Sequence, residues 1–91
     1  MSAYGRENDI FRFLLVALLG ELEAPPEVVI PTFIRALDDE YDDTRAVAAR
    51  ALGEIGPPAA AAIPKLTQLL KDSDQDAREA AAEALKTIRG K

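Results

Sequence analysis

The chain has 91 residues, neither cysteine nor histidine, and a formal net charge of −5. The missing residues exclude disulfide bonds, thiolate or imidazole catalysis and nearly all zinc, copper or iron sites. The acidic balance disfavours nucleic acid as a partner, and the 48% apolar and 30% charged content is typical of one globular domain. We therefore expect no cofactor and no metal ion.

Five helices are predicted, since no segment shows the period-two alternation of a strand. Asn8 or Asp9 can cap the first helix, which runs to about residue 23 and leaves residues 1–7 as a flexible N-terminus. Asp42 or Asp43 can cap the third helix. The other helices are expected at about 27–38, 42–55, 59–71 and 75–89, because Pro-Pro pairs at 25–26 and 57–58 break the chain.

The apolar stretch at residues 10–19 is the one candidate for a membrane or targeting segment. It is too short to span a bilayer and contains Arg12. Acidic Glu7 and Asp9 precede it, whereas a signal peptide begins with basic residues. We therefore expect no membrane span, no signal peptide and a cytoplasmic location.

The sequence repeats itself every 33 residues. Residues that recur at this spacing include Arg12, Arg45 and Arg78, and also Leu19, Leu52 and Leu85. A period of this length is typical of a solenoid, in which each helical unit buries its apolar side against its neighbours. The predicted domain, residues 8–91, therefore divides into a half repeat at 8–23 and repeats at 27–56 and 59–89.

The copy at residues 69–88 contains a more specific pattern. A leucine-rich segment ends at Asp72 and Asp74, and Arg78 is followed by an alanine-rich run with Leu85 and Ile88. This order resembles the HEAT repeat, in the short form of phycobilisome-lyase-like proteins. The resemblance implies an all-α solenoid of about two and a half HEAT-like hairpins, with five helices. Ankyrin and tetratricopeptide repeats have similar periods, but their histidine and tryptophan signatures are absent.

The resemblance also implies a function. HEAT repeats suggest a non-catalytic scaffold for protein–protein interaction, with the second helix of each hairpin on the concave side. A basic or amphipathic helical segment would suit this surface as a partner. The residues expected to bind it are Phe11, Phe13, Val16, Ala17, Arg50, Glu54, Glu79, Glu83 and Lys86. The alternative is an accessory module of a phycobilisome-lyase-like, chromophore-handling system; a DNA-binding HEAT-like protein is opposed by the acidic charge.

The first helix departs from the later copies. Its apolar arc comprises Ile10, Phe11, Leu14, Leu15, Leu18, Leu19 and Leu22, and Phe13 and Val16 lie outside that arc. Phe13 aligns with Ala46 and Glu79, so the first helix has a large apolar side chain at a position where the later copies have a small or a charged one. Two interpretations remain open: Phe11, Phe13 and Val16 fold back on the chain, or they form a partner surface for an upstream repeat or a homodimer.

Two groups of charged residues have structural interpretations. Arg45 and Arg78 are predicted to bind carbonyls or carboxylates in the turns of their own or the preceding repeat, with Asp39 and Asp72 as acceptors, although an anion-binding series is the alternative. The acidic residues at 38–43 are predicted to form an exposed turn and not a catalytic acid–base pair. The Asp72-x-Asp74-x-Asp76 spacing imitates a calcium loop but lacks its glycine.

Overall fold

The computed structural model describes residues 2–90, with the side chains of residues 7–90, and confirms the all-α prediction for that part of the chain. The helices in chain order are α1 (Ser2–Glu21), α2 (Pro26–Ala36), α3 (Asp42–Ile55), the 3-10 helix η1 (Pro57–Ala62), α4 (Ile63–Leu69) and α5 (Gln75–Arg89). None of them combines the length and the apolar character that a membrane crossing requires.

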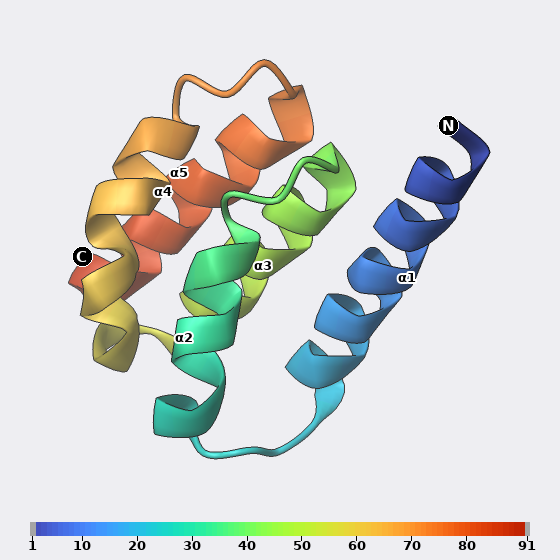
Figure 1. Ribbon diagram of the computed structural model, residues 1–91. Coiled ribbons are helices and arrows are strands. Elements are labelled where there is room, and N and C mark those ends of the chain that lie inside the picture. The colour runs from blue at the N-terminus through green and yellow to red at the C-terminus, as the bar shows by residue number, and fades with distance from the viewer. Residues whose placement is uncertain (1, 91) are drawn as a thin grey trace.

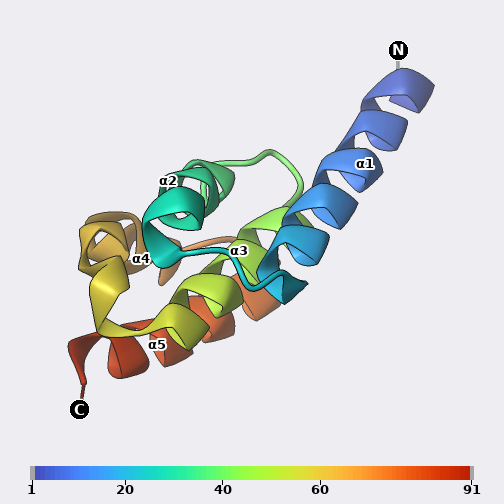
Figure 2. The ribbon, with the colours of Figure 1, turned by 90° about the horizontal axis from the view of Figure 1, so that it is seen from below.

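The helices form two layers (Figure 1). Helices α1, α3 and α5 lie side by side in one layer, and α2 and α4 cover one side of it, as the view from below shows (Figure 2). Thus α2 with α3, and η1 and α4 with α5, are two stacked hairpins, while α1 is a second helix without a first helix of its own among the described residues. The resulting body is a slab of 43 × 29 × 16 Å.

The core lies between the layers and combines bulky and small side chains. Phe33 from α2, Leu37 at the C-cap of α2 and Leu66 from α4 are almost completely buried. The alanines of α3 and α5 oppose them, and Ala48 and Ala81 have no exposed surface. Small side chains let neighbouring second helices approach closely. Each repeat therefore contributes large apolar side chains from its first helix and a closely packed, alanine-rich surface from its second helix.

Gly53 marks the closest approach of α3 to α5. A Cβ atom at this position would lie 2.9 Å from Cα and 3.1 Å from Cβ of Ala84. Gly20, which is one repeat earlier, would place its Cβ at an ordinary 3.8 Å from Cβ of Ala51. This position of the repeat therefore requires glycine between α3 and α5, at Gly53, but tolerates alanine between α1 and α3, at Gly20.

This difference predicts opposite effects for one substitution. Gly53→Ala is expected to lower the free energy of unfolding by about 1–3 kcal/mol, because the α5 backbone must move away. Gly20→Ala is expected to raise it by about 0.4–1 kcal/mol, since alanine restricts the unfolded chain without a clash. Urea unfolding of the two variants checks the prediction, and a stabilising Gly53→Ala would contradict the close packing.

Three helix ends differ from the sequence prediction. The expected cap at Asn8 or Asp9 is wrong, because α1 begins at Ser2 and so includes most of the segment predicted to be flexible. No proline interrupts the chain there, and the Asp9 carboxylate accepts a hydrogen bond from Arg12 instead of capping the helix. The fourth helix is divided, because residues 57–62 after the Pro-Pro pair wind as a 3-10 helix.

The third difference concerns the start of α3. Its N-cap is Tyr41, without a side-chain cap, and Asp42 is already helical. The equivalent residue in the next repeat, Asp74, does cap α5 and accepts a hydrogen bond from the Ala77 amide. The Tyr41 ring instead contacts Phe13 edge-on, with ring centroids 6.0 Å apart. The tyrosine therefore exchanges a cap for a contact with α1.

The repeated arginines connect successive repeats. Nη1 of Arg45 donates to the carbonyls of Asp39 and Glu40 in its own turn, at 2.8 and 3.1 Å. Its Nη2 donates to the Asp72 carboxylate of the following repeat, at 3.0 Å. Arg12 likewise binds Asp39 of the following repeat through two nitrogens. The predicted carbonyls of the arginine's own turn are confirmed, but the prediction of a carboxylate from its own or the preceding repeat is wrong, because the bound carboxylate belongs to the following repeat.

The last arginine completes only half of this pattern. Nη1 of Arg78 donates to the carbonyls of Asp72 and Ser73 in its own turn, at 2.7 and 3.2 Å. Within residues 7–90 it has no carboxylate partner, because no later turn stands beside it. Arg45 and Arg78 therefore each fix the turn before their own helix, and Arg12 and Arg45, which are followed by a further turn, also bind the aspartate of that turn.

Candidate interaction surface

The layer of second helices carries a groove between α3 and α5. Its volume is about 290 Å³, and it lies on the side of this layer that α2 and α4 leave uncovered. The residues that line it are Arg50, Gly53, Glu54, Ala80, Glu83, Ala84 and Thr87. Glycine and alanine form the floor because the two helices approach closely there, and longer side chains form the walls.

A second groove of about 200 Å³ lies between α1 and α3, one repeat earlier. Its lining residues are Val16, Ala17, Gly20, Glu21, Val47, Arg50, Ala51 and Glu54. Ala17, Gly20 and Glu21 stand 33 residues before Arg50, Gly53 and Glu54 of the first groove. Arg50 and Glu54 line both grooves and form the ridge between them, so the repeat produces two adjacent copies of one surface.

The walls of the groove between α3 and α5 carry charges that the chain does not neutralise. Arg50, Glu54 and Glu83 are exposed, and no ion pair within residues 7–90 includes any of them. The hydroxyl of Thr87 is already engaged, because it donates to the Gly53 carbonyl at 2.8 Å. Two carboxylates and one guanidinium are therefore available to a partner, with a net negative charge.

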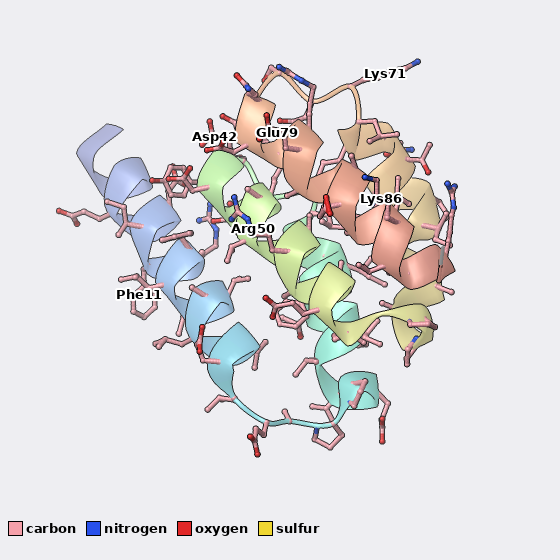
Figure 3. The ribbon with its side chains drawn as sticks, turned by 180° about the vertical axis from the view of Figure 1, so that it is seen from behind. Phe11, Asp42, Arg50, Lys71, Glu79 and Lys86 are labelled. Atoms are coloured by element: carbon pink, nitrogen blue, oxygen red, sulfur yellow. The ribbon has the colours of Figure 1, made fainter. Side chains whose placement is uncertain are left out.

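The predicted binding residues fall into three groups. Ala17, Arg50, Glu54 and Glu83 line the grooves, together with Val16, while Glu79 and Lys86 are exposed on α5 outside them. Figure 3 shows Arg50 and Lys86 on the second-helix layer, whereas Phe11 projects from α1 on the side away from α3. Phe13 is half-buried against Tyr41.

Sequence reasoning missed the floor of the main groove. Gly53, Ala80 and Ala84 are small residues, and the period assigned them only to helix packing. The available signal was that Gly20 and Gly53 share a column, since a glycine inside a helix marks a close approach. A close approach of two helices leaves a shallow channel beside the contact.

The acidic turns are engaged in structural contacts. Burial raises the pKa of Asp39, but hydrogen bonds from Arg12 and from the Tyr41 amide outweigh it and leave the pKa below its ordinary value. The same balance, with Arg45 and the Asp74 amide as donors, lowers the pKa of Asp72. No group of three acidic side chains within residues 7–90 is placed to hold a metal ion.

Stacked helical hairpins joined by repeated arginine–aspartate pairs define the class of the chain: it is an α-solenoid. A family model described as HEAT repeats matches residues 2–90, so the chain belongs to the HEAT repeat family. HEAT repeats are commonly scaffolds for protein interaction and are in general non-catalytic. Neither the curated proteins nor the solved structures gave a significant match.

Proposed function

We propose that this chain is a non-catalytic interaction scaffold that binds a basic, amphipathic helical segment of a partner protein on its second-helix layer. The observation that supports the proposal is the pair of adjacent grooves, with floors of glycine and alanine and walls of unpaired charge. Small floor residues leave room for aliphatic side chains of a partner helix. Glu54 and Glu83 would attract lysine or arginine beside them.

A designed peptide tests this proposal. The probe is a helical peptide of leucine, alanine and lysine with one apolar face, and the comparison peptide has the same composition in scrambled order. We expect the amphipathic peptide to bind and the scrambled one to bind at least ten-fold more weakly, as measured by fluorescence anisotropy. Equal binding of both peptides would mean that net charge alone attracts them.

Charge reversal then locates the site. Glu54→Lys with Glu83→Lys is expected to weaken peptide binding about ten-fold, because two favourable contacts at the groove rim become repulsive. The matched control, Glu27→Lys with Glu40→Lys, changes the net charge equally at exposed positions outside both grooves. If the control loses as much affinity as the groove variant, the grooves are not the binding site.

We further propose that the chain self-associates through α1. Five large apolar side chains of this helix are exposed, as is Leu22 directly after its end, and the side chains of Phe11 and Leu22 are 62% and 65% accessible. Contiguous exposed apolar patches of several hundred Å² are often functional and mark interaction surfaces.

The alternative proposal, an accessory role in chromophore handling, rests on the resemblance of residues 69–88 to phycobilisome-lyase-like repeats. A cytoplasmic location likewise remains a proposal. Visible absorbance of the protein purified from a pigment-containing lysate tests the first of these, because bound pigment would favour it over the scaffold.

A further inference from the structure

The exposed side of α1 is the surface that an internal repeat uses against its predecessor. We define the α1 apolar face as Ile10, Phe11, Leu14, Leu15 and Leu18 together with Leu22, which directly follows the helix and whose amide donates to the Leu19 carbonyl; all six are exposed. Leu15 aligns with Ala48 and Ala81, which are completely buried between the layers. Leu18 aligns with Ala51 and Ala84, which meet the glycine of the preceding second helix. The question is which element can cover this face.

An upstream repeat of the same design does not fit against it. The contact between α3 and α5 is so close that a Cβ on Gly53 would lie 2.9 Å from Cα of Ala84. In the equivalent position α1 carries Leu18, whose branched side chain needs a wider separation of the helix axes. In addition, α1 remains helical at residues 6–8, where the other copies form turns at 39–41 and 72–74.

The opposite end of the solenoid does not fit either. Lys86 occupies the column of Gly20 and Gly53, so α5 lacks the glycine that permits a close approach. Arg78 and Arg89 lie on the same helix, and the one large exposed apolar side chain of the last repeat, among the residues described, is Leu70. A second copy therefore cannot stack head to tail through an apolar contact.

The remaining complement is the α1 apolar face of a second copy. The face leaves on the order of 500 Å² of apolar side chain exposed, which is in the upper part of the range for the largest apolar patch of a monomer, and such patches are often functional. Pairing two such faces buries on the order of 1,000 Å², at the low end of specific interfaces, so a weak and concentration-dependent dimer follows. The large side chains of this face, such as Leu18, prevent the close packing of a further repeat. The same side chains can interdigitate when two helices pack at a wider separation.

The spacing along the helix sets the orientation. Phe11, Leu15, Leu18 and Leu22 follow one another at intervals of 4, 3 and 4 residues, which read the same in both directions. An antiparallel pair therefore places Phe11 against Leu22 of the second copy, and Leu15 against Leu18 of the second copy. Antiparallel helices also oppose their dipoles, and a two-fold axis closes the assembly at two chains.

We infer, on the basis of the proposed self-association, that two copies form an antiparallel α1–α1 dimer with two-fold symmetry, and that this face is a self-association site rather than the seat of a further repeat. Glu7, Glu21 and Glu23 flank the face, and the antiparallel register brings Glu7 of one copy to the end of the seam that carries Glu21 and Glu23 of the other, so carboxylates repel one another at both ends. Added salt therefore strengthens this dimer, whereas it weakens the binding of a basic peptide to the grooves.

Sedimentation over a range of protein concentrations tests the dimer. Leu15→Glu is expected to raise the dimer dissociation constant at least about 100-fold, because it buries an unpaired carboxylate in the apolar seam. The helical circular dichroism of this variant is expected to be retained, since residue 15 is exposed in the monomer. Leu70→Glu, an exposed apolar position at the other end, is the matched control and is expected to dimerise normally.

Cysteine cross-linking tests the orientation, and the chain has no cysteine of its own. Phe11→Cys and Leu22→Cys are prepared separately, mixed and oxidised. We expect disulfides between the two variants and few within either one, because only the antiparallel pair brings residues 11 and 22 together. Cross-linking within each variant would overturn the antiparallel arrangement alone. A monomer at all concentrations would overturn self-association, and a mass above two chains would overturn the two-fold closure.

Discussion

Exchange of Arg45 for methionine is expected to lower the free energy of unfolding by about 2–4 kcal/mol. The guanidinium binds two carbonyls of its own turn and the Asp72 carboxylate of the following repeat, and the side chain is only 15% exposed. Methionine preserves the aliphatic stem but leaves the carboxylate, itself 13% exposed, without its partner. The Nε atom of Arg45 is already buried without a hydrogen bond, which moderates the expected loss.

Arg12 provides the matched control because it occupies the same column. It binds Asp39 through two nitrogens and also Asp9, but its side chain is 40% exposed. Arg12→Met is therefore expected to cost much less than Arg45→Met, since water screens the first pair and replaces its hydrogen bonds. Urea unfolding of both variants measures the difference, and equal losses would show that burial does not set the strength of these pairs.

Arg45→Lys separates charge from geometry. An ammonium group cannot contact the carbonyl of Asp39 and the carboxylate of Asp72 with the planar spread of a guanidinium. Lysine is therefore expected to restore less than half of the stability lost in the methionine variant. Full restoration would mean that the positive charge alone stabilises the turn.

The repeat predicted the fold because its signals are local. The Pro-Pro pairs end helices by steric exclusion of the α conformation, and the structure breaks near both of them. The predicted start of the first helix was wrong because an aspartate can either cap a helix or bind a neighbouring side chain. The Asp9 carboxylate binds Arg12 and does not cap α1. Tyr41 shows the same limit, since its ring contacts Phe13 of a distant helix, which the local sequence could not indicate.

The candidate surface was harder to predict, because exposure depends on which neighbour is present. A helical wheel identified the apolar arc of α1 but could not tell that no helix covers it among the described residues. Phe13 and Val16 lie outside the arc and nevertheless contact the chain, because α3 approaches α1 from that side. Comparison of positions 33 residues apart identified where the copies differ. The grooves depend instead on positions where the copies have the same residue, such as Gly20 and Gly53.

Leu52→Ala is expected to cost about 3–5 kcal/mol, the largest effect among the three leucines of its column. Leu52 has no exposed surface and lies in α3, the central second helix, between α1 and α5. Truncation there leaves a cavity that three packed elements cannot easily fill. A loss of this size is a large part of the stability of a 91-residue domain, so thermal unfolding followed by circular dichroism measures it directly.

The same truncation at the equivalent leucines of the first and last copies, Leu19 and Leu85, provides the controls. Leu85→Ala is expected to cost somewhat less than Leu52→Ala, because Leu85 is 5% exposed and has a neighbouring repeat on one side only. Leu19→Ala is expected to cost least, about 1–2 kcal/mol, since within residues 2–90 α1 has no first helix of its own to pack against it. The measurement is made below the concentration at which the chain self-associates. If Leu19→Ala then cost as much as Leu52→Ala, α1 would be held as firmly as the central helix, and its apolar face would not be the open end of the solenoid.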